Sequence, residues 1–293
     1  MGIDGGGSTI RVALTDEKRN IVAHFKQNRN SNPTSTGFDY LKETLSLIRH
    51  RLIDYVNDIS RIVISLAGVG AQQQLIKTKK IVSEVFFESQ NIFVYHDAHG
   101  SLLANAPEEA AILVICGTGS AIVGKDENES FCRAGGWGYL LGDEASGFWL
   151  VKSLFQEYLA FHDGIREDDS AFDVFREQFE NEPRDSLYRF YEANYRRDTA
   201  SLSSVFLNRE YPLAQRFVIE GIHIIKKCID VMRNKIEDPV KSIIYMGGMF
   251  ESTFFLNQFK MINTDEIVLK QGKKHIEIEL AMIGKEKDGR DKK

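Results

Sequence analysis

Two glycine-rich turns in this sequence could hold phosphate groups. Gly5-Gly6-Gly7-Ser8-Thr9 joins two short apolar runs, and Gly117-Thr118-Gly119-Ser120 joins two more. Phosphate oxygens need backbone N–H donors in a concave turn, and glycines let the phosphate approach because they carry no side chain. Neither turn has the pattern of a P-loop, and neither leads directly into a helix as a dinucleotide-binding turn does. Either turn alone would be interpreted as a tight hairpin, whereas two copies favour nucleotide binding.

Two aspartates stand where a carboxylate could take part in chemistry. Asp4 lies immediately before the first glycine turn, where it could help hold Mg²⁺ through water or could simply cap the turn. Asp97 follows the apolar run 92–95 and begins a predicted helix. At the carboxyl end of a parallel strand it would face the region where α/β proteins bind ligands, although on spacing alone a helix N-cap is the simpler interpretation.

A dense glycine segment further along the chain could bind a sugar. Gly135-Gly136-Trp137-Gly138 is followed by Leu141-Gly142-Asp143-Glu144, so that an aromatic ring and two acids lie within ten residues. Glycines let a backbone approach a ligand closely, and carboxylates accept hydrogen bonds from hydroxyls. Such loops can also be structural, but the two acids favour binding. Gly247-Gly248, after the apolar run 242–246, is by itself an ordinary strand–helix turn.

The elements that must position these residues alternate between short strands and helices. Strands are predicted at 10–15, 21–25, 62–66, 92–95, 111–116, 121–124 and 242–246, and helices at 41–56, 73–87 and over much of 146–235. This pattern predicts an α/β fold with parallel strands. Because the strand–glycine turn–strand pattern occurs twice, we expect an internal duplication with two lobes, 1–107 and 108–293. Residues 242–246 form the last clear strand, and a closing helix is expected around 279–283.

The composition is that of a globular cytoplasmic protein. The chain has 293 residues, of which 43% are hydrophobic, and its formal net charge of -5 argues against a surface for nucleic acid or anionic lipid. The three cysteines, Cys116, Cys132 and Cys228, have no CxxC spacing and suit a reducing compartment. No apolar run approaches the roughly 20 residues that cross a bilayer, and the N-terminus has no signal-peptide pattern. We therefore expect no membrane or nucleic-acid partner.

At these motifs the chain resembles the N-acetylglucosamine kinase family, of the BadF-type ATPases within the actin/hexokinase/heat-shock chaperone superfamily. The matching stretches run in family order across most of the chain, and the Gly135–Gly147 segment is the part specific to the sugar kinases. The resemblance implies duplicated, ribonuclease H-like lobes that close on the substrate. It also implies that ATP and Mg²⁺ are used to phosphorylate the 6-hydroxyl of an amino sugar, N-acetylglucosamine first among the candidates. It is compatible with a homodimer.

The resemblance also assigns roles to individual residues. It makes Asp97 the general base that accepts the proton of the sugar hydroxyl, and Asp4 a residue that helps place Mg²⁺. The sugar would be held by Asn32, Gly136, Trp137 and Asp143. The ATP phosphates would be surrounded by Gly6, Ser8, Thr9, Gly117, Thr118 and Gly119, with Gly247 and Gly248 near the adenosine.

The chain departs from the family pattern at both ends, which keeps two other functions open. Met1 immediately precedes Gly2, where the family usually has several more residues of strand, and the region after Phe259 lacks the expected proline-flanked segment. One alternative is an ATPase that activates a CoA-ester dehydratase or reductase through an iron–sulfur cluster, with Cys132 near the relevant region. The other is a non-catalytic protein that binds a sugar or nucleotide. Glucosamine, N-acetylmannosamine and N-acetylmuramic acid stay open as substrates.

Overall fold

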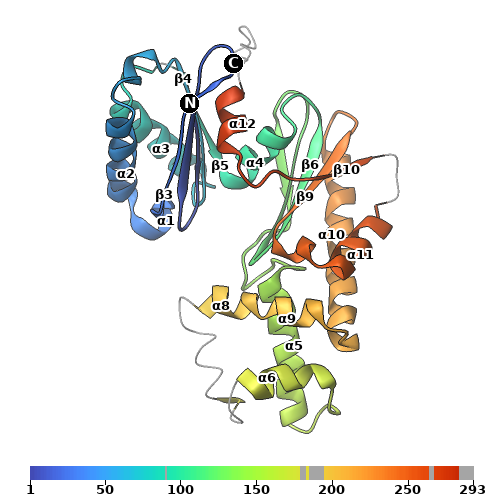
Figure 1. Ribbon diagram of the computed structural model, residues 1–293. Coiled ribbons are helices and arrows are strands. Elements are labelled where there is room, and N and C mark those ends of the chain that lie inside the picture. The colour runs from blue at the N-terminus through green and yellow to red at the C-terminus, as the bar shows by residue number, and fades with distance from the viewer. Residues whose placement is uncertain (90, 179–182, 185–194, 264–266, 284–293) are drawn as a thin grey trace. The chain divides into compact units, whose positions relative to one another are not determined.

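The chain folds into two compact units that are described separately. The computed structural model (Figure 1) describes residues 1–89, 91–178, 183–184, 195–263 and 267–283. The first unit comprises Met1–Pro107 together with the chain from Lys273 onward, and the second comprises Glu108–Gly272. The division after residue 107 coincides with the expected lobe boundary.

The first unit contains a mixed five-stranded sheet with the strand order β3-β2-β1-β4-β5. Its strands are β1 (Gly2–Gly5), β2 (Ile10–Thr15), β3 (Ile21–Gln27), β4 (Arg61–Leu66) and β5 (Asn91–His96). β1, β2 and β3 pair antiparallel, whereas β4 and β5 run parallel to β1. The antiparallel start and the parallel strands that follow it were both expected.

Helices cover both faces of this sheet. They are α1 (Pro33–Thr36), α2 (Phe38–Arg51), α3 (Gln72–Val85), α4 (Asp97–Asn105) and α12 (Glu277–Met282), with a 3₁₀ turn at Val56–Asp58. In Figure 1, α2 and α3 lie on one side of the sheet and α12 on the other. Ile3, Ile64 and Leu45 belong to the fully buried core on the α2 side. Successive strand residues point to opposite faces, so Asp4 faces away from that core.

The C-terminal helix α12 completes the first unit rather than the second. A Cβ atom on Gly2 would lie 2.1 Å from the carbonyl oxygen of Glu277 and 2.4 Å from the backbone nitrogen of Ala281, so only glycine lets α12 approach β1 this closely. Thr15 also donates a hydrogen bond to the Ala281 carbonyl at 3.3 Å. The expected second lobe of 108–293 is therefore corrected: from Lys273 the chain belongs to the first unit. The six residues of α12 are too few for their periodicity to indicate which sheet the helix packs on.

The second unit repeats the topology of the first. Its sheet has the order β10-β9-β6-β7-β8, with strands β6 (Ala111–Cys116), β7 (Ser120–Lys125), β8 (Phe131–Ala134), β9 (Ser242–Met246) and β10 (Val268–Gln271). Its first three strands are again antiparallel neighbours, and the last two run parallel to the first. This repeat confirms the predicted duplication. The expectation that 242–246 was the last strand was wrong, because β10 is a short, mostly exposed edge strand.

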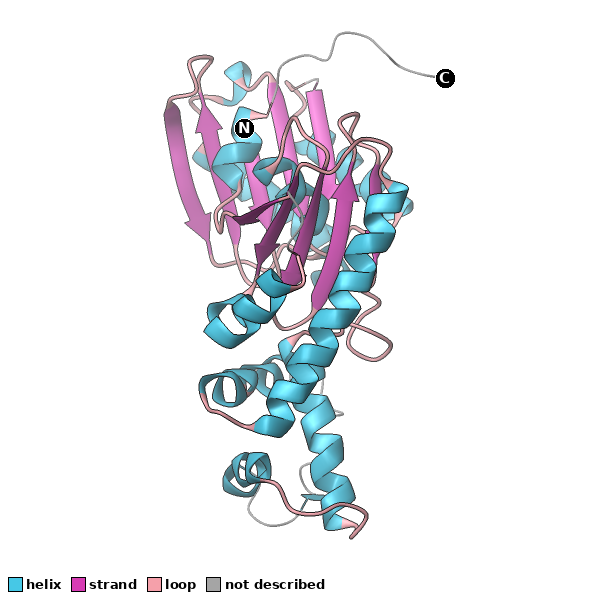
Figure 2. Cartoon of the chain, turned by 90° about the vertical axis from the view of Figure 1, so that its right-hand side faces the viewer, coloured by secondary structure: helices cyan, strands magenta, loops and turns pink. Residues whose placement is uncertain are grey.

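Helices also pack on the second sheet and extend beyond it. They are α5 (Gly147–His162), α6 (Asp173–Gln178), α8 (Tyr195–Ser201), α9 (Ser203–Asn208), α10 (Pro212–Lys235) and α11 (Thr253–Met261), with 3₁₀ turns at Ser170–Phe172 and Gly248–Glu251. Figure 2 shows the long helix α10 running beside the strands. Its buried face includes Ile222, Ile225 and Ile229, as the sequence predicted. In the described part of the chain, no helix combines the length and the hydropathy of a membrane span.

Candidate functional site

The first glycine turn is an exposed hairpin between β1 and β2. Its backbone is closed by a hydrogen bond from the Gly6 N–H to the Thr9 carbonyl at 2.9 Å, and the Gly6 carbonyl accepts one from the Ser31 N–H at 3.0 Å. Gly7 and Ser8 are exposed. A Cβ atom on Gly7 would meet nothing within 4 Å. No side chain that the structure describes therefore approaches this point of the turn within 4 Å, and a phosphate site requires such open space.

Asp4 stands at the end of β1, largely buried beside other charged groups. Its Oδ2 atom lies 3.8 Å from the Arg11 guanidinium, on the neighbouring strand. The pKa of Asp4 is raised from 3.8 to about 6, mainly by burial and next by the charge of Glu277; Arg11 lowers it, and Asp97 makes a smaller raising contribution. A cation next to this carboxylate would therefore be stabilised, because the positive charge of Arg11 does not offset the effects of burial and of Glu277.

The donor set suits a cation that is carried by phosphates and water. Among the described residues, no group of three or more His, Cys, Asp or Glu side chains is arranged to hold a metal ion. Mg²⁺ usually keeps several waters and binds through one or two carboxylates plus substrate phosphates. A single carboxylate, Asp4, immediately before an exposed glycine turn fits that mode of binding.

Asn32 begins the short helix α1 and uses its side-chain oxygen to cap it. Its Oδ1 atom accepts hydrogen bonds from the Thr34 N–H at 2.9 Å and from the Thr34 hydroxyl at 2.5 Å. Gly68, which follows β4, has a φ of 77°, and a Cβ atom there would lie 1.9 Å from Asn32 Oδ1. Because the oxygen is engaged, Asn32 would contact a sugar through its amide N–H₂ group.

Asp97 is the first residue of α4 and directly follows the parallel strand β5. Its Oδ1 atom accepts a hydrogen bond from the Ala98 N–H at 2.8 Å and lies 2.9 Å from His96 Nδ1. The same His96 nitrogen also lies 3.3 Å from the Ala98 N–H. It cannot donate and accept at once, and the shorter contact favours a proton on Nδ1 that is donated to Asp97. The side chain of Asp97 is 46% exposed, so Oδ2 can reach a substrate.

A glycine in α4 sets the position of Asp97 on the sheet. A Cβ atom on Gly100 would lie 2.2 Å from the hydroxyl oxygen of Ser65, which is fully buried on β4. The same hydroxyl donates a hydrogen bond to the backbone carbonyl of Asp97 at 3.4 Å. The first turn of α4 therefore rests directly on β4, and this contact fixes the height of the Asp97 carboxylate above the strand.

In the second unit, the other glycine turn lies against Gly247 and Gly248. A Cβ atom on Gly117 would be 3.8 Å from the Gly248 nitrogen. Gly247 has a φ of 110°, and its Cβ would lie 2.2 Å from the Cys116 carbonyl oxygen, so no other residue fits there. The turn is tied to the start of α5, because the Gly147 N–H donates to the Gly117 carbonyl at 2.8 Å. The two predicted nucleotide-binding segments of this unit thus meet.

The glycine segment 135–147 forms an irregular loop with an exposed tryptophan. Gly135 and Gly136 have φ values of 68° and 66°, in the left-handed region that favours glycine. Gly136 packs on β7, since a Cβ atom there would lie 3.4 Å from Ala121. Trp137 is 67% exposed, and the Arg133 guanidinium lies 4.4 Å from its ring centroid. An exposed indole on a rigid backbone is available to stack against a ligand.

Asp143 lies at the centre of this loop and is almost fully buried. It is 4% exposed and has a φ of 58°. Its Oδ1 atom accepts a hydrogen bond from the Gly138 N–H at 2.9 Å, and its Oδ2 atom accepts one from Arg196 at 3.1 Å. Burial raises the pKa of Asp143, while these donors oppose the shift.

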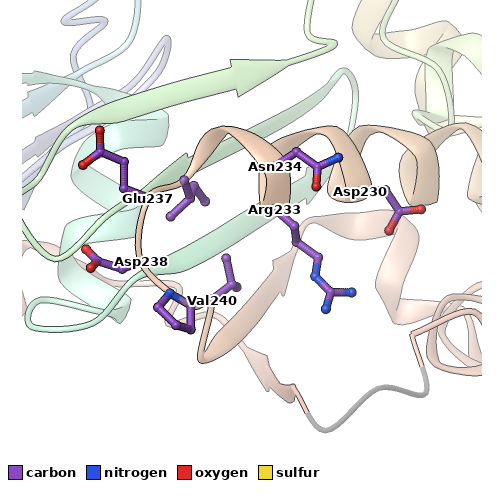
Figure 3. Close-up of a pocket in the computed structure, with 8 residues that line it drawn as sticks. Asp230, Arg233, Asn234, Glu237, Asp238 and Val240 are labelled. Atoms are coloured by element: carbon purple, nitrogen blue, oxygen red, sulfur yellow. The ribbon is translucent and has the colours of Figure 1, made fainter.

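A separate pocket lies where α10 ends. It has a volume of about 500 Å³ and is lined by residues 230–240, among them Arg233, Glu237 and Asp238 (Figure 3). None of the predicted site residues belongs to it. Its mixture of acids and one arginine does not match the chemistry expected of either glycine turn, so it is not the candidate site.

Several residues near the candidate site were not expected from the sequence. Arg196 contacts Asp143 from α8, His96 contacts Asp97, and Glu277 raises the pKa of Asp4 from α12. None of them belongs to a glycine motif, and Arg196 and Glu277 are distant in sequence from the residues they contact. Only the position of His96, next to Asp97, offered a signal.

Comparison with known proteins identifies a family and two relatives. A model of the BadF/BadG/BcrA/BcrD ATPase family matches residues 1–281. The chain is 27% identical over 193 residues to the N-acetyl-D-glucosamine kinase of Dictyostelium discoideum, covering 61% of this chain and 60% of that protein. It is 29% identical over 151 residues to the N-acetylmuramic acid/N-acetylglucosamine kinase of Clostridium acetobutylicum, covering 50% and 49%. The matched segments thus span only about half to three fifths of these relatives.

Solved structures share the fold. The crystal structure of a Porphyromonas gingivalis protein, described as a candidate N-acetylglucosamine kinase, matches with a TM-score of 0.73 and 15% identity over 96% of each chain. At this identity the likeness concerns the fold alone. Together with the two duplicated α/β units, it confirms the predicted actin/hexokinase-like ATPase fold.

Proposed function

We propose that this chain, which belongs to the BadF/BadG/BcrA/BcrD ATPase family, is an ATP-dependent sugar kinase that phosphorylates the 6-hydroxyl of N-acetylglucosamine or a close amino sugar. The names of the two relatives described above support the substrate class. The observation that carries the proposal is the Asp97 carboxylate. It lies at the carboxyl end of a parallel strand, and one of its oxygens is held by the protein while the side chain stays half exposed.

Asp97 would act as the general base. Its Oδ1 atom is fixed by the Ala98 N–H and His96, which leaves Oδ2 to accept the proton of the sugar hydroxyl as that oxygen attacks the γ-phosphorus. Proton removal can follow the bond changes in phosphoryl transfer, so a carboxylate of ordinary basicity is sufficient. The alignment of the hydroxyl then depends on the groups that bind the sugar.

The remaining residues would bind and orient the two substrates. Asn32 in the first unit and Gly136, Trp137 and Asp143 in the second are the proposed sugar contacts. Gly6, Ser8 and Thr9 in the first unit, and Gly117, Thr118 and Gly119 in the second, would offer backbone and hydroxyl donors to the phosphates. Gly247 and Gly248 would lie along the adenosine. Asp4 would hold Mg²⁺ through water, and the ion would neutralise phosphate charge.

The proposal is tested by coupled measurement of ADP release with N-acetylglucosamine, glucosamine, N-acetylmannosamine and N-acetylmuramic acid. Asp97→Asn should lower kcat by at least ~10²-fold, the usual effect of removing a general base, with a smaller change in KM. Asp39→Asn is the matched control, because Asp39 is an exposed carboxylate in the first turn of α2. Equal activity of the Asp97→Asn variant and the parent, or no stimulation by any of the four sugars, would contradict the proposal.

An activator ATPase with an iron–sulfur cluster is the competing function, and the cysteines give it little support. Cluster ligands are cysteine thiolates, but Cys116 is fully buried, and within the described ranges of the chain no group of three or more His, Cys, Asp or Glu side chains is arranged to hold a metal. Cys116, Cys132 and Cys228 are all free thiols. A brown, iron-containing preparation after anaerobic purification would favour the activator over the kinase.

A further inference from the structure

Arg196, on helix α8, forms an ion pair with Asp143 of the Gly135–Gly147 segment. One of its terminal nitrogens, Nη2, donates a hydrogen bond to Asp143 Oδ2 at 3.1 Å. Its guanidinium lies 5.0 Å from the centroid of the Tyr139 ring. The arginine thus contacts the loop that precedes Asp143 as well as Asp143 itself, although more than fifty residues of chain separate them.

The same guanidinium lies against the predicted phosphate turn. A Cβ atom on Gly119 would be 2.5 Å from Arg196 Nη2 and 2.5 Å from Asp143 Oδ2. A side chain at position 119 would therefore push the Arg196 guanidinium away from the Asp143 carboxylate, so the ion pair favours glycine there. The pair consequently joins three segments of the second unit: the phosphate turn, the Gly135–Gly147 loop and α8.

The donors around Asp143 leave little of its carboxylate unused. A carboxylate has about four lone-pair positions. Here the Gly138 N–H takes one at 2.9 Å, Arg196 takes a second, and the Ser120 backbone N–H is a further donor. About one position remains for a ligand. A sugar hydroxyl can use it only if the carboxylate keeps this orientation.

The charge of Asp143 also depends on its neighbours. Burial raises its pKa, and Glu144 raises it further; the Gly138 and Ser120 N–H groups and Arg196 lower it. The Cys116 thiol on β6 also interacts with Asp143, and its own pKa is raised mainly by burial. Arg196 is the one cation among these groups, so its removal should favour the protonated carboxyl.

We infer that Arg196 is a positioning residue for the sugar, because it fixes the orientation and the charge of the Asp143 carboxylate so that its remaining acceptor position binds a sugar hydroxyl. This inference rests on the proposed function, in which Asp143 is a sugar contact. Arg196 itself is not required to touch the sugar. Its effect should therefore appear in sugar binding and in the pH dependence more than in the chemical step.

The test compares Arg196→Gln, Arg196→Lys and Arg197→Gln in the full-length protein. Arg197 is the matched control, since it is the adjacent arginine and is exposed. We expect Arg196→Gln to raise the KM for N-acetylglucosamine about tenfold, the loss for one charge-assisted hydrogen bond, with a smaller change in kcat. The acid limb of the kcat/KM profile should move to higher pH. Arg196→Lys should recover part of both effects, and Arg197→Gln should match the parent.

Isothermal calorimetry with N-acetylglucosamine at pH 6 and pH 8 separates this inference from the proposed function. If the parent binds the sugar but releases no ADP, the kinase proposal fails, and a weaker, more pH-dependent affinity of Arg196→Gln still supports the role of Arg196. Equal sugar affinity and an equal pH profile in Arg196→Gln and the parent would overturn the inference. So would a parent protein that binds no sugar. If Arg196→Gln fails to fold, Arg196→Met takes its place in both measurements, and a sugar affinity and pH profile equal to those of the parent would overturn the inference.

Discussion

Asp4 is expected to weaken the fold at neutral pH, and replacing it with asparagine should strengthen it. Its pKa is raised from 3.8 to about 6, first by burial and then by Glu277. A difference of about two pKa units corresponds to about 3 kcal/mol of unfolding free energy. Its side chain is 20% exposed, so solvent screens little of this effect. We expect Asp4→Asn to raise stability at pH 7.5 by up to about 3 kcal/mol, less a small loss from the Arg11 contact.

The sign of the pH dependence follows from the direction of the pKa shift. The folded protein holds the Asp4 proton more tightly than the unfolded chain does, so below about pH 4 the carboxyl is protonated in both states and carries no penalty. As the pH rises from about 4 to about 6, the unfolded chain ionises first and the folded state loses stability relative to it. Asp4→Asn should therefore differ little from the parent at pH 4 and should gain its full advantage above about pH 6.5.

The assay is the difference in thermal midpoint between Asp4→Asn and the parent across pH 4 to 8. Asp54→Asn, which removes an exposed carboxylate from the same unit, is the control for net charge. The measurement is then repeated with MgATP. A cation near Asp4 would relieve the penalty in the parent only, so MgATP should stabilise the parent more than Asp4→Asn. The variant should also lose kinase activity.

Two results would refute this reasoning. If the thermal midpoints of Asp4→Asn and the parent change with pH in parallel, the pKa of Asp4 is not raised in the folded protein. Equal stabilisation of both proteins by MgATP would mean that Asp4 does not help to place the cation.

Two other contacts give testable expectations. In Gly100→Ala the new Cβ would clash with the Ser65 hydroxyl at 2.2 Å, so α4 and Asp97 must shift and kcat should fall by about 10- to 100-fold. Adding Ser65→Gly to this variant should recover much of the lost activity. A fully active Gly100→Ala variant would show that α4 does not rest on Ser65. The buried Glu277 contacts His24 at 2.8 Å, so His24→Ala should lower the unfolding free energy by about 1–3 kcal/mol. Adding Glu277→Gln should restore part of it, and a purely additive double-mutant cycle by urea unfolding would show that the two side chains are not coupled.

The sequence was sufficient for the parts of the fold that have strong periodicity. The buried run of β4, the amphipathic face of α10 and the repeated strand–glycine turn–strand pattern are all found as expected. The edge strand β10 was missed because it has few residues and little apolar contrast. The closing helix expected around 279–283 is found as α12, but the sequence assigned it to the wrong unit. Their positions are determined by long-range packing, such as the contact between Gly2 and α12, which no local pattern records.

The sequence predicted the site residues that lie in glycine turns or at a strand end. It missed the residues that contact them from distant segments of the chain. Gly117 and Gly247 were expected to serve one nucleotide, and they meet in the second unit. Arg196 could not be found, because its contact with Asp143 depends on how the helical region after α5 folds back. Asp143 was expected to contact a sugar, and the structure shows that protein donors already use most of its carboxylate.

Both units have a glycine turn, but only the first unit has an aspartate immediately before that turn and another aspartate directly after its parallel edge strand. Asp4 stands immediately before the first turn and Asp97 follows β5, whereas the corresponding places in the second unit hold the buried Cys116 before its turn and Gly272-Lys273 after β10. A nucleotide tail carries several negative charges, so uncharged backbone donors are useful on every side of it, while each additional carboxylate without its own cation would repel it. One carboxylate for a cation and one for a proton are sufficient for phosphoryl transfer. The carboxylate that does lie beside the second turn, Asp143, is paired with Arg196, which offsets its charge.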